Sequence, residues 1–123
     1  MRLGMVDGKG WPVVTPVWHV FESGVFRVAV GSTSHKANVL RENQRAYFTV
    51  DTGATYGDTR GVRGRAKVRV IDGDVSLAVD VARKALVKYT GTDKGTHADE
   101  MLKWAPPPGT NPFFPCGSSW SWM

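Results

Sequence analysis

Several short stretches within the first 71 residues are rich in apolar and β-forming residues, and in the last of them apolar and polar positions alternate almost perfectly, a pattern typical of strands. The stretches span residues 2–6, 13–21, 25–30, 45–51 and 60–71. Turn residues separate them, and the run from Asp7 to Gly10 is typical of a hairpin turn because Asp-Gly favours positive φ. Strands in hairpin order with few helices predict a small antiparallel barrel.

Helical periodicity occurs in two places. One helix is expected from about Ser34 to Asn43, and a second from Ser76 to Tyr89 with Gly91 as its C-terminal cap. The apolar residues of the second helix lie close to one stripe, at Leu77, Val81, Ala85 and Tyr89. We therefore expect this helix to cover a sheet or the mouth of the barrel.

The chain is expected to form one domain. Its 123 residues are enough for a single core, and 41% hydrophobic residues is usual for a globular chain. We assign residues 1–72 to the barrel strands, 74–104 to a helical cover and 105–123 to a Pro-rich tail. The prolines of that tail exclude a central strand over residues 105–115.

Sixteen Lys and Arg residues oppose eleven Asp and Glu residues, which gives a formal net charge of +5. This balance suits an anionic ligand, either a phosphorylated cofactor or nucleic acid. Cys116 is the only cysteine, which excludes an intrachain disulfide, and His19, His35 and His97 are too scattered to predict a metal site. No stretch has the pattern of a secretory signal or a membrane span, so we expect a cytoplasmic protein without a membrane partner.

A run of small polar residues from Gly31 to Lys36 joins the strand at 25–30 to the first helix. It places three hydroxyls, backbone N–H groups and a lysine at one helix N-terminus. Such a helix start binds phosphate well, because its unpaired N–H groups and the helix dipole favour an anion. The alternative is that Ser34 only caps the helix.

The stretch 13–21 is apolar on both faces and has Pro16 in its middle. Proline removes a hydrogen bond of the ladder, so it belongs on an edge strand, at a bulge, or where something other than a strand approaches. A flat aromatic ligand along Thr15 to Trp18 is one such neighbour. A bulged edge strand with Trp18 in the core is the alternative.

Several motifs in this order resemble the pyridoxamine 5′-phosphate oxidase-related split barrels, which bind FMN or a deazaflavin coenzyme. They are Asp7-x-Gly-x-Gly-x-Pro12, Val14-Thr15-Pro16-Val17-Trp18, Ser-x-Ser-His-Lys36-x-Asn38-x-Leu40-Arg41 and Arg60-Gly61-Val62-Arg63-Gly64-Arg65-Ala66. The resemblance implies a mainly β fold with flanking helices, a six-stranded antiparallel split β-barrel. It also implies a homodimer with two cofactor sites at the interface.

Carried over by position, the resemblance implies which residues contact the cofactor. Thr15, Pro16, Val17 and Trp18 would line the isoalloxazine ring, while Ser32, Thr33, Ser34 and Lys36 would hold the phosphate, with Asn38 supporting that loop. Arg60 is a candidate for a contact across the dimer. His35 stands where many relatives have an arginine, which weakens a bidentate grip on the phosphate. No catalytic residue is identified, which is compatible with a flavoenzyme because the cofactor carries the hydride.

Four basic residues alternate along the stretch 60–71, namely Arg63, Arg65, Lys67 and Arg69. On a strand they would lie on one face, spaced about 6.6 Å apart. They could follow a nucleic-acid backbone or the anionic tail of a deazaflavin coenzyme. A solvated sheet face is the plainer explanation.

These residues predict an FMN-binding oxidoreductase, which transfers a hydride or electrons between the flavin and a nicotinamide or small substrate. A deazaflavin-dependent reductase of the same fold is the alternative. A different class, a small basic barrel that binds single-stranded nucleic acid, is less favoured because Tyr47 and Phe48 are adjacent and face opposite sides of a strand. A barrel that carries or senses its cofactor without turnover remains a further alternative.

Overall fold

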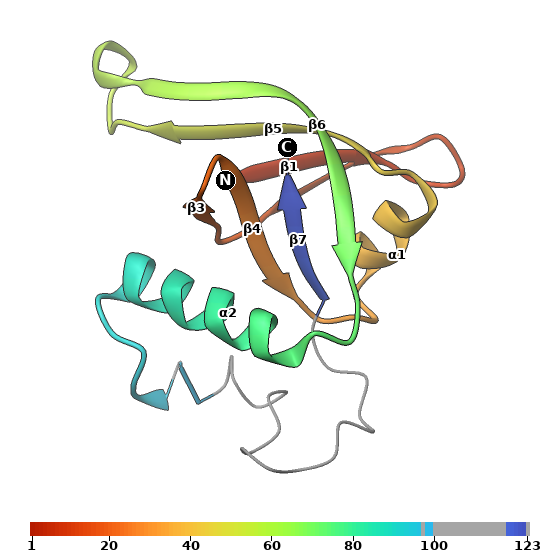
Figure 1. Cartoon of the computed structure of the whole chain (residues 1–123). Coiled ribbons are helices and arrows are strands. Elements are labelled where there is room, and N and C mark those ends of the chain that lie inside the picture. Colours follow the sequence, from red (N-terminus) through yellow and green to blue (C-terminus); the bar gives the residue numbers. More distant parts are fainter. Residues whose placement is uncertain (97, 100–117, 123) are drawn as a thin grey trace.

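The computed structural model describes residues 1–96, 98–99 and 118–122 (Figure 1). Its elements are β1 (Arg2–Val6), β2 (Pro12–Pro16), β3 (Val20–Glu22), β4 (Val25–Val30), α1 (His35–Glu42), β5 (Arg45–Thr52), the 3₁₀ turn η1 (Tyr56–Asp58), β6 (Arg60–Ile71), α2 (Val75–Thr90) and β7 (Ser118–Trp122). Every strand pairing is antiparallel, and the described strands form a seven-stranded sheet in the order β2-β1-β5-β6-β7-β4-β3. This mainly β architecture with flanking helices confirms the predicted split barrel.

The expected strand over residues 13–21 is two strands, β2 and β3, which lie at opposite edges of the sheet. The ladder with β1 ends at Pro16, whose ring removes the N–H that a further rung needs. Val17 still bonds to Met1 through its N–H (2.9 Å) and its carbonyl (3.2 Å), and the chain then crosses to the edge beside β4. When the interrupted strand is counted once, β7 is the sixth strand of the predicted barrel.

Strand β7 closes the sheet, because it pairs with β4 on one side and with β6 on the other. It is the last part of the segment 105–123 that was expected to be a Pro-rich tail. Residues 105–115, His97 and Cys116 lie outside the described residues. Among the helices of the described residues, none is long and apolar enough to cross a membrane.

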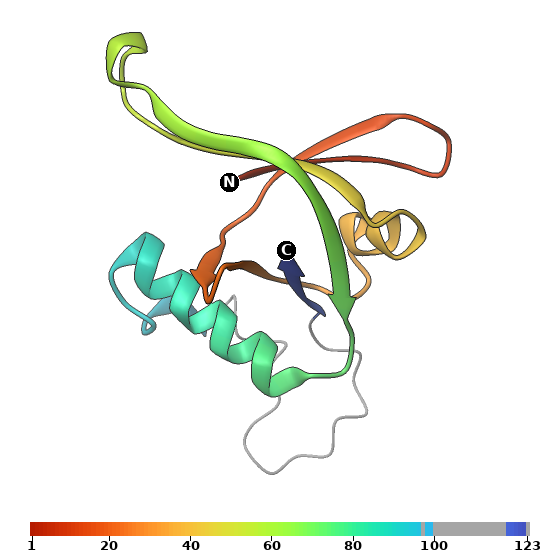
Figure 2. The same ribbon diagram turned by 45° about the horizontal axis from the view of Figure 1, so that its top comes forward.

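The hairpin of β5 and β6 projects beyond the rest of the sheet (Figures 1 and 2). Burial changes along β6, where Val68 is fully buried while Val62, on the same face of the strand, is 55% exposed. Gly61 allows the close approach of the two strands near the tip, because a Cβ there would lie 2.6 Å from the Val50 carbonyl oxygen. The outer half of the hairpin therefore exposes apolar surface.

The two helices cover different parts of the sheet (Figure 1). The first core cluster joins α1 to the strands and contains Leu3, Met5, Val17, Val28, Ala37, Val39, Leu40 and Val68. Helix α2 lies over β3, β4 and β7, where Val81 and Ala85 pack against Val20, and this confirms its predicted role as a cover. Complete burial of Leu86 on α2 contributes roughly 1.5–3 kcal/mol to folding.

The helix ends lie within one residue of the predicted ones. Ser34 caps α1 and Asp74 caps α2, each through a side-chain oxygen that accepts a backbone N–H, and Gly91 ends α2 with a φ of 81°. The first hairpin turn is also present, since Asp7 Oδ1 accepts backbone N–H groups within it. Its positive φ falls on Gly10 (84°) and not on the Asp-Gly step, so that detail of the prediction was wrong.

Candidate functional site

The turn between β4 and α1 is a compact helix start. The Ser34 N–H donates to the Gly31 carbonyl at 3.1 Å, which closes a β-turn over this run. Ser34 then caps α1, because its Oγ accepts the Ala37 N–H at 3.4 Å and its carbonyl accepts the Asn38 N–H at 3.1 Å. The capping role that the sequence offered for Ser34 is therefore present, and it orders the turn in which the other polar residues stand.

The same helix start carries donors that suit an anion. The N–H groups of His35 and Lys36 point out of the helix end, since the first residues of a helix have no intrahelical acceptor. Thr33 is exposed, and Ser32 and Lys36 are half-buried. The first turn of α1 contains no acidic residue. N–H groups, hydroxyls and an ammonium without a competing carboxylate are a donor set that fits a phosphate group.

Asn38 lies one turn into α1 and is bonded to the helix itself. Its Oδ1 accepts from the Arg41 Nη1 at 2.7 Å, and Arg41 also binds both carboxylate oxygens of Asp72, at 2.7 and 3.1 Å. These bonds tie α1 to the residue that follows β6. Any support that Asn38 gives the phosphate loop therefore acts through the orientation of α1.

The segment Thr15–Trp18 links the end of β2 to the crossing toward β3. Thr15 and Trp18 are half-buried and Pro16 is exposed, whereas Val17 is only 7% exposed and belongs to the core cluster. Both backbone polar groups of Val17 bond to Met1. A ligand along this segment would meet Thr15, Pro16 and Trp18, with the Val17 side chain below them in the core.

The structure brings these two segments to one core but leaves Arg60 apart. Val17 and Ala37, the third residue of α1, share the same core cluster, so the segment and the helix start border it together. Arg60 is exposed and pairs with Thr52 at the far end of the β5–β6 hairpin. Its contact with a cofactor across a dimer stays a prediction.

A polar cluster beside Trp18 is absent from the sequence-based prediction. His19 is 5% exposed, with its Nε2 3.0 Å from the Lys88 Nζ and its Nδ1 2.8 Å from the Tyr89 hydroxyl. The Lys88 Nζ also donates to the His19 carbonyl at 3.2 Å. The Tyr89 ring stacks on Trp18, with centroids 5.0 Å apart and 9° between the planes. The last turn of α2 is thus joined to the segment expected to line the cofactor ring.

The charges of this cluster determine its hydrogen bonds. Burial, followed by the Lys88 and Met1 ammonium groups, lowers the pKa of His19 to about 4. His19 is therefore neutral near pH 7, so that Nε2 accepts from Lys88 and the Nδ1–H donates to Tyr89. Burial also lowers the pKa of Lys88. Only the adjacency of His19 to Trp18 could have indicated the cluster, because Lys88 and Tyr89 lie far away in sequence.

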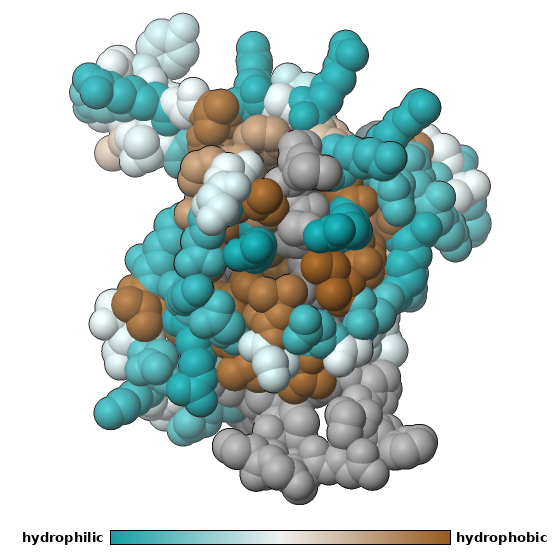
Figure 3. Space-filling model, viewed as in Figure 1, coloured by the Kyte–Doolittle hydropathy of each residue, from teal (hydrophilic) through white to brown (hydrophobic). Residues whose placement is uncertain are grey.

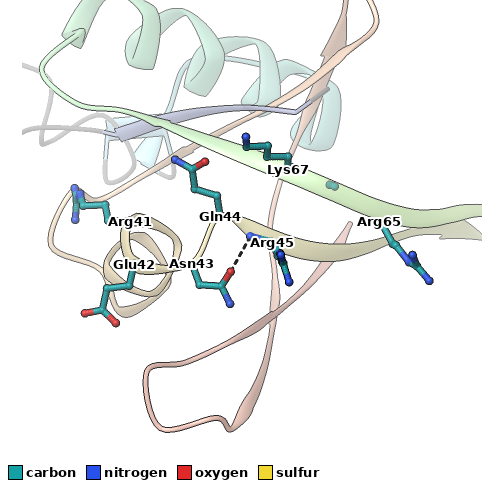
Figure 4. A pocket seen from close by; sticks show the side chains of 8 residues that line it. Arg41, Glu42, Asn43, Gln44, Arg45, Arg65 and Lys67 are labelled. Carbon is teal, nitrogen blue, oxygen red and sulfur yellow. Dashed lines mark hydrogen bonds between the residues drawn. The ribbon is translucent and has the colours of Figure 1, made fainter.

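A basic groove lies at the other end of α1, against the base of the β5–β6 hairpin. Its volume is about 670 Å³, and it is lined by Arg41, Glu42, Asn43, Gln44, Arg45, Arg65, Ala66 and Lys67 (Figure 4). Arg45 and Lys67 pair directly across the two strands, an arrangement in which like charges repel. Within the described part of the chain, Arg45, Arg65 and Lys67 form no ion pair. The groove is therefore a second surface that suits an anion.

The antiparallel sheet with its two flanking helices defines the class of this protein, a small split barrel, as the motifs indicated. The family model described as pyridoxamine 5′-phosphate oxidase matches residues 1–105. The chain therefore belongs to the pyridoxamine 5′-phosphate oxidase family. A comparison with curated protein sequences gives no match.

Several solved structures share the fold. A conserved hypothetical protein from Mycobacterium tuberculosis superposes with a TM-score of 0.70 at 20% identity, covering 99% of this chain and 69% of that one. HutZ, a heme storage protein from Vibrio cholerae, gives 0.67 at 12% identity over 99% and 78% of the two chains. A pyridoxamine 5′-phosphate oxidase-related, FMN-binding protein from Nostoc punctiforme gives 0.65 at 15% identity over 99% and 69%. An F420 reductase is similar as well, with 0.61 at 15% identity over 99% and 82%. At these identities the likeness concerns the fold.

Proposed function

We propose that this protein binds FMN and acts as an oxidoreductase, which passes a hydride or electrons between the flavin and a nicotinamide or other small substrate. The observation that carries the proposal is the start of α1, where Lys36, the hydroxyls of Ser32 and Thr33 and the outward N–H groups stand together without an acidic residue in the first turn. Membership of the family and the FMN-binding protein of the same fold support it.

In this proposal each end of the site has its own task. Ser32, Thr33, Ser34 and Lys36 hold the phosphate, which anchors the cofactor by charge and hydrogen bonds. Thr15, Pro16 and Trp18 lie along the ring and exclude water from it. The bound flavin itself supplies the hydride chemistry, so the residues of the chain contribute position and electrostatics.

A second copy of the chain completes the site in this proposal. Arg60 at the tip of the β5–β6 hairpin would reach the cofactor of the partner. A shallow apolar hollow of about 330 Å³ on β2, β1 and β5, which includes Val14 (69% exposed) and Tyr47, offers surface for the partner to cover. The space-filling view also shows apolar surface in the middle of one face of the molecule (Figure 3). Exposed apolar patches of this kind favour association.

A deazaflavin coenzyme is the second candidate, and one observation favours it. The cations of Arg65 and Lys67 in the basic groove have no carboxylate partner among the described residues, and they suit a cofactor with a longer anionic tail. The F420 reductase of the same fold supports this candidate. HutZ, which has the same fold, stores heme, and His19 is unsuited to ligate one because both of its ring nitrogens already have partners.

Titration of purified protein with FMN, followed by quenching of flavin fluorescence, tests the proposal. Lys36→Ala should weaken binding by about 1–3 kcal/mol, roughly 5- to 150-fold in Kd, because a charge-assisted hydrogen bond to the phosphate is lost. Lys9→Ala, which removes a cation from the exposed first hairpin turn, is the matched control and should bind as the wild type does. Equal affinity of Lys36→Ala and the wild type would contradict the assignment of the helix start. The same titration with a deazaflavin coenzyme ranks the two cofactors.

A further inference from the structure

We propose that Tyr89 is a positioning residue of the cofactor site, one that sets the orientation of the Trp18 indole while His19 holds the tyrosine in place. This inference rests on the proposed function, since it takes Trp18 to lie beside the cofactor ring. It assigns a role to the last turn of α2, an element that the sequence-based prediction treated only as a cover.

The geometry restrains Tyr89 from two consecutive residues of the β2–β3 connection. The face of its ring lies nearly parallel to Trp18, at 9° and a centroid distance of 5.0 Å. Its hydroxyl is bonded at 2.8 Å to the Nδ1 of His19. A stack alone permits sliding and rotation, whereas a stack with a tethered hydroxyl defines one arrangement of the two rings.

His19 is itself held by contacts from two elements, α2 and β4. From α2, Lys88 bonds to its Nε2 and to its carbonyl, and Tyr89 bonds to its Nδ1. From β4, the Phe26 ring meets the imidazole edge at a centroid distance of 5.4 Å. The charged groups that face it are the Lys88 and Met1 ammonium groups. The tether is therefore made by a neutral imidazole whose two ring nitrogens are both bonded to α2.

The hydrogen bonds of a buried polar cluster fix the orientation of its side chains, whereas an apolar side chain at the same place would only fill the space. A leucine at position 19 would occupy the same core, but it would leave the Tyr89 hydroxyl without its partner. Trp18, which stacks on the Tyr89 ring, and His19, which bonds to the Tyr89 hydroxyl, are consecutive residues, so their positions are coupled through the backbone. The cluster therefore transmits the position of α2 to the indole.

Two substitutions at Tyr89 separate the stack from the tether. Tyr89→Phe keeps the ring and removes the hydroxyl, so FMN affinity should fall by about two- to fivefold and the visible circular dichroism of the bound flavin should change. Tyr89→Leu removes both and should weaken FMN binding by about tenfold. Val87→Ala, at an exposed position two residues earlier on α2, is the control and should leave both readouts unchanged. All variants are compared at a temperature where far-ultraviolet circular dichroism shows them folded.

The pH dependence of the flavin circular dichroism provides a second readout, one that a purely packing role of the cluster would not change. Protonation of His19 puts a positive charge beside Lys88 and Met1 and removes the acceptor of the Lys88 bond, so the flavin dichroism should titrate with His19. Lys88→Met removes one of the two cations that face His19. The midpoint of the pH titration of the flavin dichroism should then shift to higher pH, because the imidazolium meets less repulsion.

The outcomes separate this inference from the proposed function. If the wild type binds neither FMN nor a deazaflavin coenzyme, the proposed function is wrong and the inference falls with it. If the wild type binds FMN and Tyr89→Leu binds equally, with the same flavin dichroism, only the positioning role is wrong. Weakened binding by Tyr89→Leu, partly rescued in Tyr89→Phe, supports both.

Discussion

The two ends of the candidate cofactor site are built in different ways. The phosphate end consists of consecutive residues, Ser32 to Lys36, and the bonds of Ser34 to Gly31, Ala37 and Asn38 join this turn to the first turn of α1. The ring end depends on α2, because the bonds from His19 to Lys88 and Tyr89 join residues 69 and 70 positions apart. The first end offers charge and N–H donors, and the second offers stacking on a buried anchor. Changes at the phosphate end should therefore alter affinity, while changes at the ring end should also alter stability.

The largest effect is expected at the ring end when the pH falls. His19 has an ordinary pKa of 6.5 when unfolded and one of about 4 when folded, so its contribution to stability is complete above pH 6.5 and is lost as the pH falls toward 4. This shift corresponds to at most about 3 kcal/mol. Urea unfolding of the wild type and His19→Gln across this range measures it, and the variant should lack that part of the pH dependence. His35→Gln, at an exposed position on α1, should retain it.

That comparison has a clear negative result. Every other titrating group is common to both proteins, so the difference between their curves isolates the imidazole. Identical slopes for the wild type and His19→Gln between pH 6.5 and 4 would mean that His19 is not held neutral in the folded protein. The ring end would then lack its buried anchor, and the contrast between the two ends would disappear.

Smaller changes in stability and FMN affinity are expected from two substitutions of Ser34, which distinguish its capping role from anion binding at the phosphate end. Ser34→Ala removes the cap of α1 and should cost about 1 kcal/mol of folding stability. Ser34→Asp keeps a capping oxygen but places a carboxylate beside the phosphate, so stability should stay near that of the wild type while FMN affinity falls by about tenfold. Urea unfolding and FMN titration of the same preparations report the two quantities. Unimpaired FMN binding by Ser34→Asp would show that the turn is only a helix cap.

The smallest effect on the flavin is expected from the basic groove, which lies at the opposite end of α1. Replacing both Arg65 and Lys67 with Ser should leave FMN affinity within about twofold and should weaken retention on heparin, because two unpaired cations are lost. Stability should rise by a few tenths of a kcal/mol, since Lys67 no longer repels Arg45 directly across the strands. Loss of FMN binding would instead mean that this groove lines the cofactor site.

Features that depend on neighbours in sequence were predictable. β-Rich stretches between turn residues located β1, β4 and β6 at their observed bounds, with alternation clearest along β6. Ser34, Asn43 and Gly91 lie at helix ends because capping is a local effect. Pro16 indicated an interruption or an edge, and it lies at the end of an edge strand. The helix start was found for the same reason, since all its donors follow one another along the chain.

Features that depend on tertiary contacts were not predictable from the pattern. The split of residues 13–21 into β2 and β3 follows from which strands stand beside each half, and alternation carries no information on that. The strand β7 follows a Pro-rich stretch that gives no β pattern, yet it finds partners in β4 and β6. The neutral state of His19 requires burial next to α2, so no inspection of residues near position 19 could assign it.

The central claim, that this split barrel binds a flavin-type cofactor, is tested most directly by the absorbance spectrum of freshly purified protein together with the mass of any small molecule released on denaturation. We expect the visible bands of an oxidised flavin and the mass of FMN, with a deazaflavin coenzyme as the second candidate. A colourless protein that also fails to bind either added cofactor would contradict it.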